Sequence, residues 1–280
     1  MSGRSPGRGR SLAIRGREPL RPIRLFGLFL RVGALNELQY RANLAVQLFQ
    51  SLIALLTGLA VLALVFGQTT NLAGWSQPEL LTVMGVHILM GGLIGTAVQP
   101  NMERLMADVR EGTLDYILTK PEDAQVLVSV REFRIWQSVD VAIGAIVLGV
   151  AIAQLEAGVG LLSALAFVAA LVLGAVMIYC FWLILTTGAF FIVRMDELHE
   201  LWEGIYQSGR WPVGVYPGWL RISLTFLVPI AFAVTVPAEA LTARLTPETL
   251  GLAAGFTLFL LLVTRLWWRF GLKHYSGASA

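Results

Sequence analysis

The chain has 280 residues, of which 56% are hydrophobic and only 14% are charged, and its mean hydropathy is +0.70. Because an ordinary soluble domain carries about 25% charged residues, this composition excludes that class and predicts an all-α polytopic membrane protein. A single cysteine, Cys180, excludes an intrachain disulfide. The net charge of +3 is small, so the placement of the charges is more informative than their sum.

The N-terminal residues 1–18 are rich in Gly, Ser, Pro and Arg and predict a disordered basic cytoplasmic tail. Its Arg-Gly pairs could contact RNA, but we expect the anionic lipid surface as its neighbour and no nucleic acid as a partner. Residues 22–43 then predict an amphipathic helix lying at the membrane interface, with a basic stripe opposite an apolar one. The stripe consists of Arg17, Arg21, Arg24 and Arg31.

Six apolar stretches are predicted to cross the membrane. Residues 44–66 contain no charge and would be roughly 34 Å long as a helix, which is enough to cross the hydrocarbon core. Residues 160–193 exceed one bilayer, so we expect this span to project or to bend near residues 186–188. Pro229 interrupts the fifth stretch. The expected spans are residues 44–66, 80–99, 136–155, 160–193, 220–237 and 250–268, within a permease domain of residues 19–275 and before a short tail of residues 276–280.

The positions of Lys and Arg predict the orientation. Of the 21 such residues, all except Arg244 fall in the N-terminal segment, in the second and fourth connections or at their edges, or within the last 16 residues. By the positive-inside rule both termini are cytoplasmic. We therefore expect six spans with both ends inside, in a bacterial cytoplasmic (inner) membrane.

A charge-dense island, residues 100–121, separates the second and third spans. Asn101 can cap a short helix there, Gly112 can end it, and Arg104 can pair with Asp108 four residues on. Four apolar residues follow the i, i+3, i+4, i+7 rule and form one face. That face either lies in the headgroups or under the bundle, or docks into a soluble partner. The four residues are Met102, Leu105, Met106 and Val109.

Enzyme signatures are absent from the sequence. It has no G-x-x-x-x-G-K-[ST] motif for ATP, no G-x-S-x-G or H-E-x-x-H motif, and no His, Cys or carboxylate group at metal-ligand spacing. We therefore predict a protein that is not an enzyme and that holds no cofactor or metal of its own.

Polar residues inside the spans are candidates for function, because a charge at the bilayer centre is costly. His87 in the second span and Asp140 in the third are the two candidates. Each could instead simply bond to a neighbouring helix. Two isolated groups are too few for a proton relay, which argues against a proton-coupled carrier. The Gly91-x-x-x-Gly95 pair would let another helix backbone approach the second span.

Several short motifs, taken in order, resemble the membrane subunits of type-2 ABC exporters, in the branch that includes viologen-exporter-like permeases. The resemblance covers about residues 21–275. The motifs are Glu-Leu-Gln-Tyr-Arg-Ala-Asn at 37–43, Arg-Glu-Gly-Thr-Leu-Asp at 110–115 before Lys120-Pro121, Gly-Arg-Trp-Pro at 209–212 and Val-Pro-Ala-Glu-Ala at 236–240.

This resemblance implies that two permeases, identical or sister chains, pair in the bilayer above a separate cytoplasmic ABC ATPase dimer that binds ATP and magnesium. It implies a coupling helix at residues 101–111 and short re-entrant helices at about residues 237–246. The expected ATPase-docking residues are Asn101, Met102, Leu105, Met106, Val109, Arg110 and Glu111.

The sequence thus predicts the permease subunit of an ATP-driven exporter. A non-transport membrane scaffold is the first alternative, and a secondary transporter is the second. The cargo, the direction of transport and the identity of the second permease stay open.

Overall fold

A computed structural model describes residues 27, 41–155, 158–188, 190–191 and 198–275. The expected basic tail, nearly all of the expected interfacial helix and the last five residues lie outside this set. Within it, helices make up nearly all regular structure, and the β-pairing is an isolated bridge between Leu72 and Trp75. The prediction of an all-helical membrane protein is confirmed for these residues.

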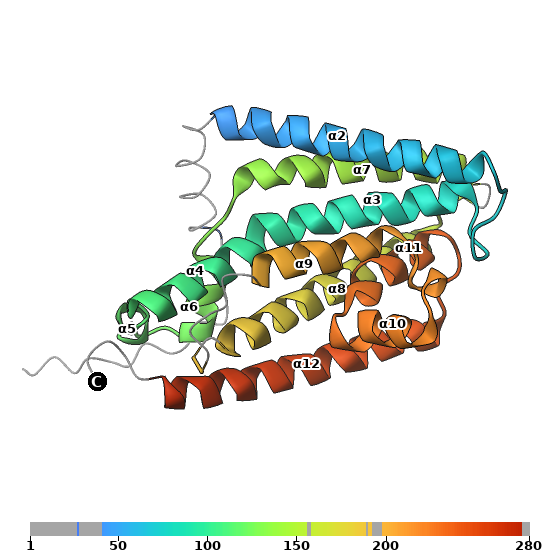
Figure 1. Cartoon of the computed structure of the whole chain (residues 1–280). Coiled ribbons are helices and arrows are strands. Elements are labelled where there is room, and N and C mark those ends of the chain that lie inside the picture. Colours follow the sequence, from blue (N-terminus) through green and yellow to red (C-terminus); the bar gives the residue numbers. More distant parts are fainter. Residues whose placement is uncertain (1–26, 28–40, 156–157, 189, 192–197, 276–280) are drawn as a thin grey trace, which may run out of the picture.

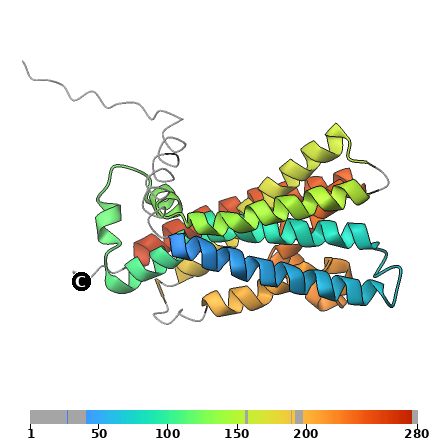
Figure 2. The ribbon, with the colours of Figure 1, turned by 90° about the horizontal axis from the view of Figure 1, so that it is seen from above.

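Five described helices are long and apolar enough to cross a membrane, and one bent helix pair could add a sixth crossing. The long helices run roughly side by side (Figures 1 and 2). The start of α2 at Arg41 and the end of α12 at His274 both lie at the end that carries the short helix α5 (Asp115–Leu118). We call this the α5 end. The long helices are α2 (Arg41–Phe66), α3 (Gln77–Leu93), α7 (Ser138–Gln154), α8 (Leu161–Gly188) and α12 (Pro247–His274).

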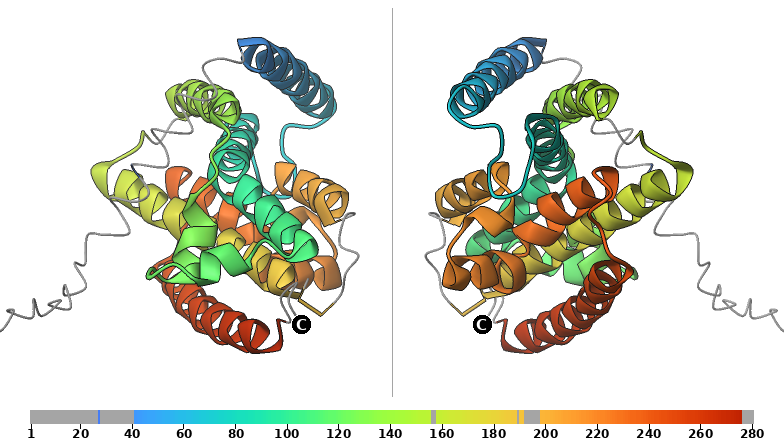
Figure 3. Two further views of the ribbon diagram at one scale, coloured as in Figure 1. Left: turned by 90° about the vertical axis from the view of Figure 1, so that its left-hand side faces the viewer. Right: turned by 90° about the vertical axis from the view of Figure 1, so that its right-hand side faces the viewer.

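Helix α8 ends at Gly188. The fourth apolar stretch is therefore helical over 28 residues, shorter than the predicted residues 160–193, and no bend near residue 186 is needed. End-on views place α2 and α12 on opposite sides of the bundle with α3 between them (Figure 3). Helix α3 is accordingly the central element, and eleven of its residues are buried.

The second span does not stop at the membrane boundary. A π-helical turn, η1 (Ile94–Val98), joins α3 to α4 (Gln99–Glu111), so that residues 77–111 form one helix of 35 residues. Pro100 has no N–H to donate to the carbonyl of Thr96, and the backbone N–H of Arg134 donates to that carbonyl instead, at 3.0 Å. The prediction that Asn101 begins and caps a separate helix is therefore wrong. Gly112, with φ of 70°, does end the helix as expected.

Glycines let α3 and α7 pack with their backbones close together. A Cβ added to Gly144 would lie 2.4 Å from the backbone N of Leu89, and one added to Gly92 would lie 2.5 Å from the N of Val141. Gly91 and Gly95, the pair expected from the sequence to serve this purpose, instead face the side chains of Tyr206 and Gln137. The predicted close approach exists, but it uses other glycines.

This packing predicts that Gly144→Ala lowers the free energy of unfolding by about 1–3 kcal/mol, because the new methyl group must push α3 away. Gly149→Ala is the matched control on the same helix, since a Cβ there meets nothing within 4 Å. The measurement is thermal unfolding of the two detergent-solubilised variants. Equal melting temperatures for both would show that α3 and α7 are not in close contact at Gly144.

The fifth crossing is assembled from separate pieces. Helix α9 (Leu198–Gln207) and a 3-10 turn η3 (Ser208–Arg210) lead to Gly209, whose added Cβ would lie 2.7 Å from Ile230. The chain resumes from Ile230 through η6 (Ala231–Thr235) and α11 (Val236–Leu241). Residues 211–229 make an excursion that contains α10 (Gly218–Ile222) and η5 (Ser223–Leu227), bent by 78° from the following pair.

Two expectations are corrected by this arrangement. Residues 220–237 do not form one continuous helix, and the break falls at Pro229 as expected. Residues 198–210 do not form a separate polar loop, because they pack against α3: the Tyr206 hydroxyl donates to the carbonyl of His87 at 2.8 Å. The residues expected to be re-entrant, 237–246, form most of α11 and the turn that leads into α12.

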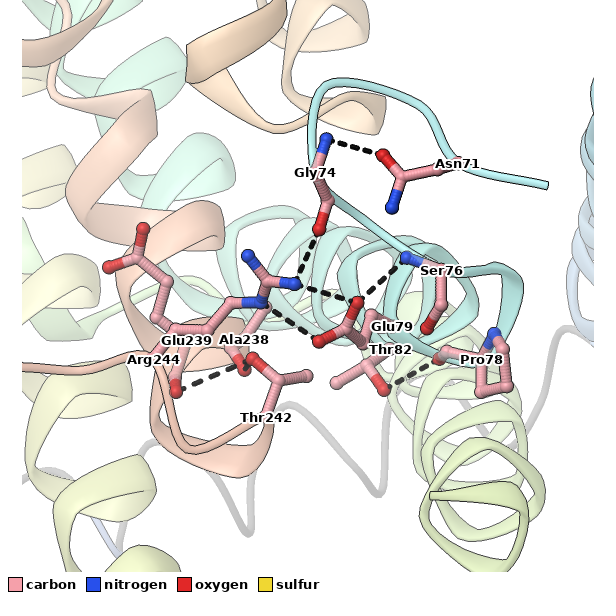
Figure 4. Close-up of polar contacts among 10 residues, drawn as sticks. All are labelled: Asn71, Gly74, Ser76, Pro78, Glu79, Thr82, Ala238, Glu239, Thr242 and Arg244. Atoms are coloured by element: carbon pink, nitrogen blue, oxygen red, sulfur yellow. Dashed lines mark hydrogen bonds and ion pairs between the residues drawn. The ribbon is translucent and has the colours of Figure 1, made fainter. Parts of the chain in front are cut away.

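A polar clamp joins two connections at the end opposite α5 (Figure 4). The Arg244 guanidinium contacts both carboxylate oxygens of Glu79, at 2.8 and 2.9 Å, and donates to the carbonyl of Gly74 at 2.5 Å. It also lies 4.7 Å from the ring centroid of Trp75. Glu79 in turn accepts from the backbone N–H of Ser76 at the start of α3. The clamp therefore holds the α2–α3 loop against the turn between α11 and α12.

Candidate functional site

A groove of about 390 Å³ lies between α2, α3, the start of α7 and α9. It brings together His87 and Asp140, which the sequence presents as isolated polar residues on different spans. Two charged residues of the α9 segment, Glu203 and Arg210, also line it. The groove therefore brings together polar side chains of α3, α7 and the α9 segment.

Asp140 connects α7 to α2. Its carboxylate accepts a hydrogen bond from Gln47 Nε2 at 2.9 Å and another from the Ser51 hydroxyl. Helix α2 is otherwise loosely attached, with large apolar side chains such as Leu56 (64% exposed) directed away from the bundle. The polar bonds at Asp140 thus hold the first span against the rest of the chain.

His87 is 6% exposed and stacks on Tyr206, with ring centroids 4.5 Å apart and an interplanar angle of 20°. Its Nδ1 is buried and has no hydrogen-bond partner among the described residues. Gly209 packs against this nitrogen, and an added Cβ there would lie 3.3 Å from it. His87 thus lines the groove, while its Nδ1 is buried on the side of Gly209.

Sequence reasoning missed Glu203 and Arg210 because it assigned their segment to a cytoplasmic connection. A signal was present, since Leu198, Trp202, Tyr206 and Gly209 recur at helical spacing. Trp202 and Tyr206 are 4% and 6% exposed and form the wall of the groove on the α9 side.

The second candidate feature is the loop at the α5 end. The apolar face of α4 points inward: Met102 and Leu105 are 0% exposed, and Met106 and Val109 are half-buried against the same core. Thr186 of α8 lies 3.5 Å from the sulfur of Met102. Of the two interpretations left open by the sequence, packing under the bundle is the one observed. The expectation that Met102 and Leu105 contact a partner is corrected, because the chain's own helices already cover them.

Asn101 also has an internal role. It is 0% exposed, and its Oδ1 accepts from the backbone N–H groups of Arg131 and Glu132 at 2.9 and 3.0 Å. Its Nδ2 donates to the carbonyls of Ala97 and Glu132. Asn101 therefore holds residues 131–132, which follow the loop, against the start of α4.

A cluster of charged and polar side chains around Asp108 fixes the direction of the loop tip. Asp108 is 2% exposed. Its carboxylate forms ion pairs with Arg131 and, at 3.3 Å, with Arg104, and it accepts a hydrogen bond from the Thr113 hydroxyl at 2.8 Å. The predicted pair of Arg104 and Asp108 is thereby confirmed. The backbone carbonyl of Asp108 also accepts a hydrogen bond from the Thr113 N–H at 2.9 Å. These bonds fix α5 relative to α4.

The exposed part of the loop is its tip. Tyr116 is 75% exposed and Leu118 is 38% exposed, and both belong to α5. Arg110 and Glu111, at the end of α4, are exposed beside them. Further along, before α6 (Ala124–Val130), Asp123 accepts from Arg265, and this hydrogen bond lowers the pKa of the Asp123 carboxyl. The tip thus presents two apolar side chains within a polar rim.

No group of three or more His, Cys, Asp or Glu residues in the described ranges could hold a metal ion. The long apolar helices, the polar groove between them and the loop at one end define the class: a multi-pass membrane protein with a polar groove in its bundle. The family described as "ABC-2 family transporter protein" matches residues 52–279. The chain belongs to this family and is a permease subunit of an ABC transporter, which in general implies an ABC ATPase as its partner. Comparisons with curated proteins and with solved structures gave no match.

Proposed function

We propose that the chain is the membrane-spanning subunit of an ATP-driven exporter in a bacterial cytoplasmic membrane. It works as a dimer with a second copy or a sister permease, and a separate cytoplasmic ATPase dimer binds ATP and magnesium. The family match over residues 52–279 carries this proposal. The narrower likeness to viologen-exporter-like permeases rests on the sequence motifs.

The distribution of cations supports a cytoplasmic α5 end. Arg104, Arg110 and Lys120 lie in the loop there, whereas the clamp residue Arg244 lies at the other end. Two cations counted as cytoplasmic from the sequence do not lie at the α5 end, because Arg210 lines the groove and Arg221 lies on α10. The remaining asymmetry still favours both termini inside.

We assign ATPase docking to the tip of the loop instead of the apolar face of α4. Tyr116 and Leu118 are the apolar side chains available there, and Arg110 and Glu111 contribute to the rim. A central apolar anchor with a polar surround is the usual pattern of a protein interface. Because residues 77–111 form one helix, a force on the tip acts directly on α3, which lines the groove.

The groove is our candidate for this subunit's part of the translocation route. It is lined by charged and amide side chains beside aromatic and aliphatic ones, and it lies against α2, the most loosely packed of the described long helices. Both properties suit a route that must admit a polar molecule and then release it.

The test is purification of the tagged chain from its native host in a mild detergent. We expect a soluble P-loop ATPase, and either a second permease or untagged copies of this chain, to co-purify. Nucleotide hydrolysis by that complex should depend on the P-loop lysine of the partner. Recovery of the chain with no ATPase would favour a scaffold, and uncoupler-sensitive transport without ATP would favour a secondary transporter; either result would contradict the proposal.

A further inference from the structure

The groove contains charged groups of both signs that do not pair with one another. The Asp140 carboxylate is bonded to the neutral groups of Gln47 and Ser51. Glu203 accepts from the neutral amide of Gln207 at 2.8 Å. The Arg210 side chain forms no hydrogen bond or ion pair with any residue in the described part of the chain.

Asp140 and Arg210 are half-buried, and Glu203 is exposed at the edge of the groove. Charged side chains among membrane helices normally pair with each other or mark a substrate pathway. At the rim of the same groove, Arg134 shows the usual solution, since it pairs with Glu103. Glu203 and Arg210 are seven residues apart on α9 and η3, roughly 10 Å along the axis, and no ion pair joins them, since Glu203 is bonded to Gln207. The charged groups of the groove are therefore available to a bound ligand.

The negative and positive side chains of the groove lie at different levels along α3. The backbone of Asp140 lies against Gly92 of α3, whereas Gly209, which precedes Arg210, lies against His87. Gly92 and His87 are separated by five residues, or roughly 7 Å along the helix. The carboxylates thus lie at levels nearer the α5 end, and Arg210 lies nearer the level of His87.

We infer that the groove binds a molecule that carries both an ammonium group and an anionic phosphate or carboxylate group. The ammonium, with three N–H donors, contacts Asp140 and Glu203. The anionic group lies at Arg210, whose guanidinium matches a phosphate or carboxylate with two parallel hydrogen bonds. The apolar rings of Trp202 and Tyr206 cover the part of the molecule between the two groups.

Other classes of ligand satisfy less of the site. A simple cation leaves Arg210 unpaired and is repelled by it, and a simple anion is repelled by the two carboxylates. A neutral molecule leaves all three charges unpaired. Since the groove is a route for cargo only if the chain is a permease, the inference rests on the proposed function, and it adds the charge class of the cargo.

The test measures binding to the chain in nanodiscs through the tryptophan fluorescence of Trp202, with Trp202→Phe as the reference for unrelated signal. Three amphiphiles with the same acyl chain are compared: lysophosphatidylethanolamine, which carries both charges, lysophosphatidylglycerol, which is anionic, and the alkylamine, which is cationic. We expect the first to bind at least tenfold more tightly than the other two. Free phosphoethanolamine is tested beside them. Comparable binding of the free compound identifies a small zwitterion, and binding of the lysolipid alone identifies a lipid.

Variants assign the two ends of the ligand. Arg210→Gln should weaken binding of the two-charge ligand about tenfold and should not weaken binding of the alkylamine, whereas Arg210→Lys should retain most of the affinity. Glu203→Gln should weaken both the two-charge ligand and the alkylamine. Equal affinity for all three amphiphiles, or an Arg210→Gln variant that binds like the wild type, would overturn the inference. If either result is found while the ATPase still co-purifies with the chain, the inference about the ligand fails and the proposed function stands.

Discussion

Leu118→Asp should abolish co-purification of the ATPase and leave the yield and thermal stability of the permease unchanged. Leu118 is 38% exposed at the tip of the loop, outside the apolar spans, so a carboxylate there remains hydrated in the isolated subunit. If α5 fills a cleft in the ATPase, the same carboxylate becomes an unpaired charge in a dry contact. Loss of such an anchor costs about 2 kcal/mol or more, which is roughly thirtyfold in affinity.

Leu118→Met is the matched control, because it keeps an apolar side chain of similar volume and should retain the ATPase. Tyr116→Ala, at the most exposed residue of α5, should reproduce the loss. The measurement is the ratio of ATPase to permease after affinity purification, together with the melting temperature of the permease. A Leu118→Asp variant that recovers a full complement of ATPase would exclude the tip as the docking surface.

Leu105→Asp should have the opposite outcome, with little folded permease recovered at all. Leu105 is 0% exposed, and it packs in the main core together with Met102, Leu114 and Ile117. A carboxylate placed there is buried without a partner, an effect that typically exceeds about 4 kcal/mol and removes most of the stability of a domain. The measurement is the amount of monodisperse protein after detergent extraction.

Leu105→Met is the control for this site, since it nearly conserves volume and should cost less than about 1.5 kcal/mol. The two leucine-to-aspartate variants also test each other. If Leu105→Asp folds normally but loses the ATPase, α4 and not α5 carries the contact, and the inward packing of α4 does not represent the working complex.

The comparison of these two leucines shows where sequence reasoning about the site reached its limit. Helical spacing correctly identified an apolar face on α4 with a stop at Gly112. Spacing alone does not say what covers such a face, because the hydrophobic effect is non-directional and an apolar face is stabilised equally by its own bundle or by a partner. Tyr116 and Leu118 belong to a helix of four residues, too short to show any periodicity.

Pro100 illustrates a different limit. A proline after an apolar stretch predicts a break, because it removes one backbone donor. The helix continues because a residue 34 positions along the chain, Arg134, supplies the missing donor to Thr96. A rule based on local sequence cannot include such a long-range hydrogen bond.

The amino-acid sequence by itself determined that this is an all-helical membrane protein, where most of its apolar helices lie, and the local pair of Arg104 and Asp108, since each depends on composition or on neighbours within one helical turn. The tertiary structure alone decided that His87, Asp140, Glu203 and Arg210 share one groove and that α9 packs beside α3. Inside a bilayer, lipid and neighbouring helices are about equally apolar, so hydropathy shows that a helix is inserted but not which face meets another helix. That choice is made by close packing at glycines such as Gly92, Gly144 and Gly209, and by the few polar groups that must find partners inside the bundle.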